Sequence, residues 1–217
     1  MIRVADEGGL RTVTIDRPEK ANSLTGDMLE ALVEAVEGAP GGALVLTGEG
    51  KVFSAGADLD EARAGLATSP LWERLSHAVA ESDALTVAAL NGTLAGGAFG
   101  MVLACDLRIA VPGAKFFYPV MKLGYLPQPS DPARLAALVG RGRARMLLLA
   151  AQKIEAGEAV AWGLVDRLAE PDALMDEAAA LCEAAVAAEP KVRAGIKAMC
   201  RGVTVPGVIS GGGDLPS

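Results

Sequence analysis

The sequence predicts an α/β fold built around parallel strands. Short apolar runs, such as residues 43–47 and 86–90, have the length and composition of buried strands. Segments with apolar residues at helical spacing alternate with them, as in residues 70–82. This repeated order of strand, helix and strand predicts a parallel sheet with right-handed crossovers.

The N-terminal segment predicts a hairpin followed by a helix. Residues 2–5 and 10–15 flank a Glu-Gly-Gly turn, and threonines alternate with apolar residues in the second run, which indicates a β-hairpin that ends before Pro18. A helix is expected to begin near Thr25 and to end at the Pro-Gly-Gly segment 40–42.

The middle of the chain continues the alternation. The expected order is a strand at 43–47, a Gly/Ala-rich loop at 48–58, helices at 59–66 and 70–82, a strand at 86–90, a turn at Asn91-Gly92, a helix that opens near Gly96, a strand at 105–110 and short elements at 115–123.

The C-terminal third is predicted to be mainly helical. Asp131 is expected to cap a helix that runs to about Val139, with Pro132 in its first turn. Further helices are expected near 141–150, 155–161, 171–188 and 190–201, with a short strand at 164–168 between them. Residues 202–217 contain Gly-Gly-Gly and no apolar period, so a flexible tail is expected there. We therefore expect one domain over residues 1–201, with a core at about 1–140 and a helical layer at about 141–201.

Charge and composition exclude several classes of protein. The chain of 217 residues carries 20 Lys and Arg against 27 Asp and Glu, and its net charge of −7 without a basic cluster argues against a nucleic-acid partner. Three cysteines without Cys-x-x-Cys spacing and a single histidine, His77, predict no metal site. The cysteines are expected to be reduced thiols in or near the core.

No membrane segment is predicted. Residues 84–105 are uncharged and long enough to span a bilayer, but Asn91-Gly92 and Gly96-Gly97 break the run and favour a buried strand followed by a helix. The N-terminus also lacks the apolar stretch of a signal peptide, so a cytoplasmic location is expected.

Two loops of small residues are candidates for a ligand site. Residues 53–59 and 94–98 each follow a predicted strand and lead into a helix, where backbone N–H groups are free to meet a negative oxygen. Two such N–H groups that converge on one carbonyl oxygen form an oxyanion hole, which stabilises an enolate or a tetrahedral intermediate. The glycine spacing at 96–100 does not fit a dinucleotide-binding fingerprint, so NAD binding is disfavoured.

The chain resembles the crotonase (enoyl-CoA hydratase/isomerase) superfamily over about residues 2–201. The residues that carry the resemblance are Arg17-Pro18, Ala21-Asn22, Leu24, the block Phe-Ser-Ala-Gly-Ala-Asp-Leu at 53–59, Asn91-Gly92, Gly96-Gly97, Cys105-Asp106, Phe116, Pro119, Leu123-Gly124, Pro127, Leu135, Gly140, Ala159 and Gly163-Leu164-Val165.

The resemblance implies a spiral of ββα units with a helical C-terminal layer. It also implies a homotrimer or hexamer that binds an acyl-CoA and needs no cofactor beyond the coenzyme A of its substrate. The oxyanion-hole amides map to Ala57 and Gly97.

The resemblance further implies a pocket for the CoA adenine. It uses backbone around Ala21, Ser54 and Ala55. Asp58 stands where the family has a loop aspartate, and the same residue can equally serve as the N-cap of the following helix.

Three departures from the family pattern bear on the reaction. The two glutamates that hold water in the hydratases correspond to Gly100 and Val120, neither of which can move a proton. In aryl-CoA dehalogenases the position of Gln128 holds the nucleophilic aspartate, so Gln128 either faces the acyl group or is a loop residue whose amide binds backbone.

Other polar residues are expected to be structural. Ser130 is a further polar candidate, packing or capping roles are expected for Tyr125 and Asp131, and an exposed or structural role is expected for His77. Glu61 lies in the first turn of a helix, where some family members place catalytic groups but where a carboxylate also interacts favourably with the helix dipole.

Two function classes remain. The first is an acyl-CoA enzyme that catalyses decarboxylation, isomerisation or thioester hydrolysis rather than hydration. Decarboxylation suits a site poor in acids best, because loss of CO₂ needs enolate stabilisation and a dry pocket but no base. The second is a subunit without catalytic activity that binds acyl-CoA or a partner protein.

Overall fold

A computed structural model describes residues 1–203. The predicted flexible tail at 202–217 lies outside the described residues, apart from its first two positions. Among the described residues no helix is both long and apolar enough to cross a bilayer.

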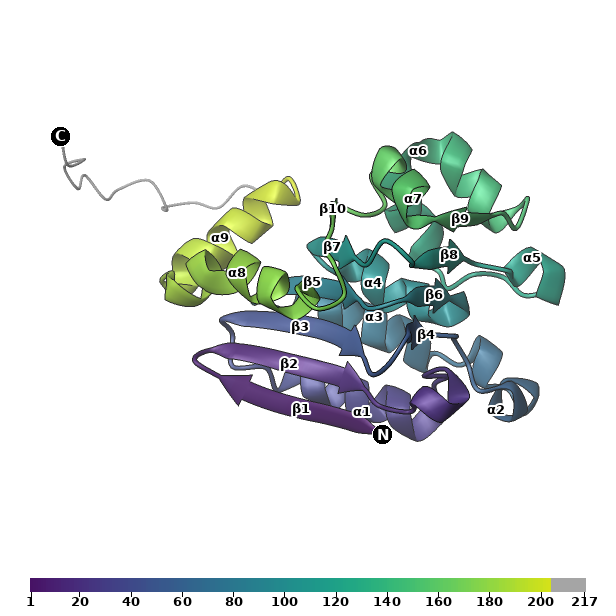
Figure 1. The fold of residues 1–217 in the computed structure, drawn as a ribbon, viewed down its shortest axis with the longest axis horizontal. Helices are drawn as coiled ribbons and strands as arrows, with labels where there is room; N and C mark the ends of the chain where they lie inside the picture. The colour runs from purple at the N-terminus through teal and green to yellow at the C-terminus, as the bar shows by residue number, and fades with distance from the viewer. Residues whose placement is uncertain (204–217) are drawn as a thin grey trace.

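Two sheets form the centre of the α/β fold (Figure 1). The larger has the strand order β1-β2-β3-β5-β7-β10 and the smaller β4-β6-β8-β9. Their bounds are β1 Ile2–Glu7, β2 Leu10–Ile15, β3 Ala43–Gly48, β4 Val52–Ser54, β5 Leu85–Leu90, β6 Thr93–Ala95, β7 Leu107–Ala110, β8 Lys115–Phe117, β9 Lys153–Glu155 and β10 Arg167–Leu168.

Consecutive strands pass from one sheet to the other. The strands β3, β5 and β7 lie in the larger sheet, and each is followed after a short turn by a strand of the smaller one. Within each set the neighbours pair in parallel, as predicted from the strand, helix, strand order. The repeated unit is therefore two strands and a helix, as the resemblance implies.

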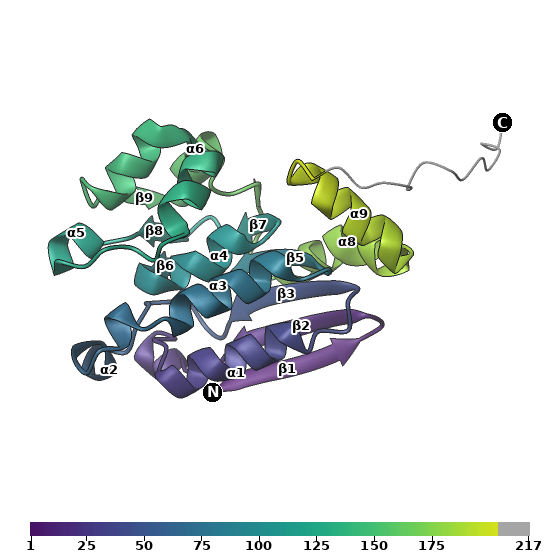
Figure 2. The same cartoon turned by 180° about the vertical axis from the view of Figure 1, so that it is seen from behind.

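Helices cover both faces of the larger sheet. Figure 2 shows α1, α3 and α4 side by side on one face, and α8 contacts β2, β3, β5 and β7 on the other. The helix bounds are η1 Pro18–Lys20, α1 Gly26–Glu37, α2 Leu59–Arg63, η2 Leu66–Thr68, α3 Leu71–Glu81, η3 Gly96–Ala98, α4 Phe99–Ala104, α5 Val120–Leu123, α6 Asp131–Leu148, α7 Ala156–Trp162, α8 Leu174–Ala187 and α9 Pro190–Cys200.

The N-terminal predictions are confirmed. The strands β1 and β2 form an antiparallel hairpin with Ile2 opposite Ile15. Thr25 is the N-cap of α1, where its hydroxyl accepts a hydrogen bond from the N–H of Met28. This cap satisfies one of the N–H groups that a helix start leaves free.

Two C-terminal predictions need correction. Asp131 does not cap α6, because Ser130 holds the N-cap position and Asp131 is the first helical residue. The short strand at 164–168 is reduced to β10, since the N–H groups of Leu164 and Val165 both donate to the carbonyl of Ala159 and continue the end of α7. The predicted break between residues 139 and 141 is confirmed as a kink within α6, because Gly140 has a φ of 80° and interrupts the helical backbone there.

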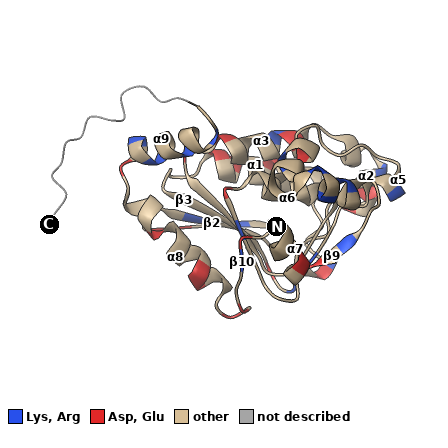
Figure 3. Ribbon diagram, turned by 90° about the horizontal axis from the view of Figure 1, so that it is seen from above, with Lys and Arg blue, Asp and Glu red and all other residues tan. Residues whose placement is uncertain are grey.

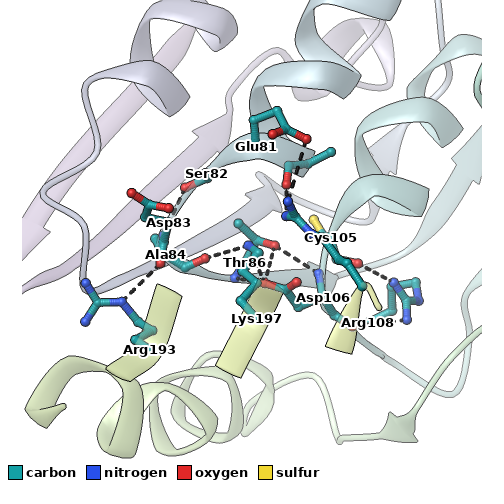
Figure 4. Close-up of polar contacts among 12 residues, drawn as sticks. Glu81, Ser82, Asp83, Ala84, Thr86, Cys105, Asp106, Arg108, Arg193 and Lys197 are labelled. Atoms are coloured by element: carbon teal, nitrogen blue, oxygen red, sulfur yellow. Dashed lines mark hydrogen bonds and ion pairs between the residues drawn. The ribbon is translucent and has the colours of Figure 1, made fainter. Parts of the chain in front are cut away.

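Hydrogen bonds and an ion pair join the helix α9 to the N-terminal ends of β5 and β7 (Figure 4). The ammonium of Lys197 lies 2.7 Å from Asp106 Oδ2 and donates to the carbonyl of Ala84. The same carboxylate accepts from the N–H and the hydroxyl of Thr86, and Arg193 donates to the carbonyl of Asp83. This network holds the C-terminal helix against the sheet.

The two C-terminal helices differ in charge. In Figure 3 α9 carries blue segments and α8 red ones, in agreement with Lys191, Arg193 and Lys197 in the first and Asp176 and Glu177 in the second.

The three cysteines differ in burial. Cys105 and Cys182 are buried, as expected, whereas Cys200 is exposed, so the expectation of a thiol in or near the core is wrong for Cys200.

Candidate active site

The two predicted loops of small residues are in contact. They follow β4 and β6, which are parallel neighbours, so their carboxyl ends lie at the same edge of the smaller sheet. Gly56 has a φ of 90°, and a Cβ atom there would lie 3.0 Å from the carbonyl oxygen of Ala95 and 3.4 Å from the N atom of Gly97. The loops approach each other closely at Gly56 because glycine adopts this φ without strain and has no Cβ atom to press on the Ala95 carbonyl.

Backbone donors are left free at this contact. The N–H groups of Ala55 and Asp58 donate to the carbonyls of Ala21 and Leu24, and that of Gly56 donates to the hydroxyl of Ser54. Within residues 1–203 the N–H groups of Ala57 and Gly97 have no acceptor. Both residues were predicted as oxyanion-hole donors, and the fold leaves both N–H groups available.

Buried Asn22 holds the loop after β4 in place. Its side-chain oxygen accepts from the N–H of Arg17 at 2.8 Å, and its amide donates to the carbonyls of Glu49 and Val52. The hydroxyl of Ser54 donates to the carbonyl of Asn22 at 2.8 Å. The predicted substrate-binding residues Ala21, Ser54 and Ala55 are thereby brought together, since Ala55 also bonds to Ala21.

Residues of both loops line a small apolar cavity. Its volume is about 150 Å³, which is below the usual range for a site that encloses a whole ligand. No Asp, Glu, Lys, Arg or His lines it among the residues that the structure describes. Its walls include Ala55, Ala57, Trp72, Gly97, Tyr118, Val120, Tyr125 and Gln128. The predicted residues Ala57, Gly97, Val120 and Gln128 therefore meet at one cavity.

Asp58 acts as a helix cap, one of the two roles that the sequence allowed. Its Oδ1 accepts from the N–H groups of Asp60 and Glu61, and its Oδ2 accepts from the guanidinium of Arg17 at 2.9 Å. The hydrogen bond from Arg17 is the main cause that lowers the pKa of Asp58. Both carboxylate oxygens are engaged, and the side chain does not line the cavity.

Two further polar candidates lie away from the cavity. Glu61 accepts a hydrogen bond from the N–H of Gly26 at 2.7 Å and joins the start of α2 to that of α1. His77 is exposed on α3, as expected. Neither residue lines the cavity.

Positions 100 and 120 differ in the space around them. Val120 lines the cavity at the start of α5. Gly100 lies one turn after Gly97, and a Cβ atom there would be 3.0 Å from Oδ1 of Asp131 and 3.4 Å from the hydroxyl of Ser76. A side chain at position 100 would therefore displace the carboxyl group of Asp131.

The carboxyl group of Asp131 is a feature that the sequence did not predict. The residue is fully buried, and its Oδ2 accepts a hydrogen bond from the hydroxyl of Tyr118 at 2.7 Å. Oδ1 has no partner among residues 1–203. Burial raises the pKa of Asp131 to about 6 and also raises that of Tyr118. A position before Pro132 is typical of a helix cap, and no local signal shows that this side chain turns toward α4.

Comparison with known proteins assigns the chain to a family. The family model described as enoyl-CoA hydratase/isomerase matches residues 5–207. The chain belongs to the enoyl-CoA hydratase/isomerase family. This confirms the resemblance to the crotonase superfamily.

Individual relatives agree with the family assignment. A protein described as a probable enoyl-CoA hydratase from Mycobacterium tuberculosis is 37% identical over 193 residues, which cover 86% of this chain and 79% of the relative. A 4-chlorobenzoyl coenzyme A dehalogenase from Arthrobacter is 37% identical over 180 residues, which cover 77% of this chain and 65% of the relative.

Solved structures of family members share the fold. The crystal structure of an enoyl-CoA hydratase/isomerase from Pseudoalteromonas atlantica superposes with a TM-score of 0.85 at 31% identity, covering 93% of this chain and 82% of that chain. The sequence relatives are thus described as enzymes of different reactions, and within one fold the reaction depends on the side chains at the site.

Proposed function

We propose that this protein binds an acyl-CoA through its thioester carbonyl and decarboxylates a β-carboxyacyl group, without acting as an enoyl-CoA hydratase. The observation that carries the proposal is that Ala57 and Gly97, whose N–H groups both lack an acceptor within residues 1–203, line the same apolar cavity. Two donors directed at one thioester oxygen stabilise the negative charge that an enolate places there.

The lining of the cavity favours decarboxylation over hydration. Hydration needs one group to activate water and another to deliver a proton, and each contributes roughly 10²–10⁴ to the rate. Residues 100 and 120, which correspond to the hydratase glutamates in the resemblance, are glycine and valine here. Loss of CO₂ creates the enolate without a base, and an apolar cavity favours that step because it desolvates the departing carboxylate.

The size of the cavity suits a short acyl group. A volume of about 150 Å³ accommodates a few carbon atoms beyond the thioester, so malonyl-CoA and methylmalonyl-CoA are the substrates to try first. The adenine end of the coenzyme is expected near the backbone of Ala21 and Ala55, which the loop after β4 presents together.

The test measures two reactions on one protein. We expect CO₂ release from malonyl-CoA or methylmalonyl-CoA, and hydration of crotonyl-CoA with a kcat/KM well below about 10⁴ M⁻¹s⁻¹, the lower edge of ordinary enzymes. Hydration above that value would contradict the proposal. Binding of acyl-CoA without turnover of any of these thioesters would instead favour the alternative of a non-catalytic acyl-CoA-binding subunit.

A matched pair of variants tests the role of position 120. Because Val120 lines the cavity, Val120→Glu is expected to raise crotonyl-CoA hydration by about 10²-fold. Val120→Gln is the matched control: glutamine has the same shape as glutamate but carries no carboxylate, so no increase is expected. Position 100 is unsuitable for the same experiment, since any side chain there would meet Asp131. Equal hydration by the two variants would show that a carboxylate at position 120 does not reach the substrate.

A further inference from the structure

We propose that Tyr118 and Asp131 form the proton-transferring pair of this site, in which Tyr118 delivers the proton to the acyl group and Asp131 resupplies it. The inference rests on the proposed function, because the enolate held by Ala57 and Gly97 is the species to be protonated. Tyr118 is then the catalytic residue, and Asp131 acts through it.

Tyr118 links Asp131 to the cavity. Tyr118 follows β8 and lines the cavity, and its hydroxyl lies 2.7 Å from Oδ2 of Asp131 at the start of α6. Its ring stacks on Phe99 with 5.2 Å between the ring centroids, which limits its movement. The pair therefore connects the cavity to a fully buried carboxyl group.

Gly100 provides the space for that carboxyl group. Oδ1 of Asp131 lies 3.0 Å from the place of a Cβ atom at position 100, so it occupies volume that any side chain there would need. Gly97 lies in η3 and Gly100 in α4, which follows η3 directly with helical backbone angles at Ala98 and Phe99, so the two glycines are three residues apart on the same face. The carboxyl group thus lies about one helical turn from the N–H group proposed to hold the thioester oxygen.

The free oxygen of Asp131 argues against a purely structural pair. A buried polar atom without a partner is costly, and native proteins keep few of them. A carboxyl group that served only to anchor Tyr118 would need one oxygen, whereas Asp131 buries a second oxygen with no donor among residues 1–203. Burial of the charged form is costly, so burial favours the protonated carboxyl group. A protonated carboxyl group can then donate its proton.

The proposed reaction accounts for every proton and electron pair. When the C–CO₂ bond breaks, its electron pair forms the enolate and CO₂ leaves. When Asp131 is protonated on Oδ2, this oxygen donates to the phenolic oxygen of Tyr118, and the hydroxyl proton of Tyr118 is free to turn to the enolate. The Cα atom takes that hydroxyl proton, and the phenolic oxygen takes the proton from Oδ2 of Asp131. The products are the shortened acyl-CoA, neutral Tyr118 and ionised Asp131, which regains a proton from solvent before the next cycle. In reverse, ionised Asp131 and Tyr118 remove a proton from Cα of an acyl-CoA.

The groups around Asp131 set its protonation. Tyr118 faces it from the end of β8, Glu73 from α3 and Arg134 from α6. Burial is the largest effect on the pKa of Asp131 and raises it to about 6, the hydrogen bond from Tyr118 lowers it, the charge of Glu73 raises it, and Arg134 lowers it. Both protonation states are therefore accessible near neutral pH, as a group that gives and regains a proton requires.

Deuterium exchange tests the pair without requiring decarboxylation. The protein is incubated with butyryl-CoA in D₂O between about pH 5 and pH 8, and incorporation at Cα is followed by mass spectrometry. We expect the wild-type rate to rise through about pH 6, because the removal of a Cα proton needs ionised Asp131. Asp131→Asn, which keeps an acceptor for Tyr118, should exchange at least about 10²-fold more slowly and without this pH dependence.

Other variants keep the test decisive if Asp131→Asn does not fold. Tyr118→Phe removes the hydroxyl, and Gly100→Ala displaces the carboxyl group without changing any functional group, so both should slow exchange. Glu61→Gln is the control, since this carboxylate also accepts a backbone N–H at a helix start but does not line the cavity. We expect its exchange rate and pH profile to match the wild type.

Binding and turnover separate the two proposals. Butyryl-CoA binding by calorimetry with intact decarboxylation, but exchange that Asp131→Asn leaves unchanged, would overturn the pair and keep the proposed function. Exchange that depends on Asp131 without decarboxylation of any substrate would support the pair and overturn the proposed reaction. A wild-type protein that binds butyryl-CoA but exchanges no Cα hydrogen overturns the pair, and one that does not bind it overturns both proposals.

Discussion

The buried carboxyl group of Asp131 makes the free energy of unfolding depend on pH. Burial raises the pKa of this group from 3.8 to about 6, so the folded protein binds its proton more tightly than the unfolded chain does. The resulting stabilisation is fully present below about pH 3.8 and is lost as the pH rises through about 6.

The size of this effect follows from the two pKa values. Between about pH 4.5 and pH 7.5 the folded group ionises while the unfolded one is already mostly ionised, which lowers the free energy of unfolding by about 2 kcal/mol. Asp131→Asn cannot ionise, so it lacks this loss. We expect the stability of the variant relative to the wild type to rise by about 2 kcal/mol over that pH interval.

Urea unfolding at the two pH values measures this difference. Comparison of the wild type with Asp131→Asn cancels the contributions of the other carboxylates. Asp58→Asn is the control. Arg17 lowers the pKa of Asp58 below 3.8, so the contribution of this carboxylate is lost only at a pH below the interval, and the stability of Asp58→Asn relative to the wild type should change little between the two pH values. A stability difference between the wild type and Asp131→Asn that stays constant with pH would refute the reasoning.

Four further outcomes follow from the structure. Asn22→Ala is expected to cost about 3 kcal/mol in urea unfolding, because it leaves buried backbone groups without partners. Gly56→Ala should cost about 1–3 kcal/mol and weaken acyl-CoA binding in calorimetry, since its φ of 90° and the 3.0 Å approach to the Ala95 carbonyl both resist a side chain. Iodoacetamide should label Cys200 in the folded protein before Cys105, because Cys105 is buried and burial raises its pKa to about 12, and mass spectrometry of peptides distinguishes the two. Light scattering is expected to show a trimer or hexamer, and a monomer at tens of micromolar would contradict that expectation.

Local patterns carried much of the fold prediction. The hairpin of residues 2–15 and the Thr25 cap each depend on residues close in sequence, so turn chemistry and helical spacing were sufficient to find them. The strand at 164–168 was predicted too long because the run Leu164-Val165 has strand composition. The carbonyl of Ala159 instead takes both N–H groups, a competition that composition does not reveal.

The candidate site likewise has features that the local sequence predicts and features that depend on tertiary structure. The loops at 53–59 and 94–98 were recognisable in the sequence, because small residues after strands mark places where the backbone must come close to another group. That Ala57 and Gly97 leave their N–H groups free beside one cavity depends on the parallel pairing of β4 with β6.

The family and the order of the elements can be predicted from the sequence alone, since they depend on short motifs and on the spacing of apolar residues. The surroundings of Asp131 are decided by tertiary packing alone, because α6 carries this residue against α4 and the end of β8, which lie far from it in sequence or across a loop. Gly100, which has no side chain, and Asp131, whose carboxyl group fills that space, lie thirty-one positions apart in the sequence. Sequence patterns report neighbours along the chain, whereas the charge state of a buried carboxyl group depends on the atoms that surround it in space.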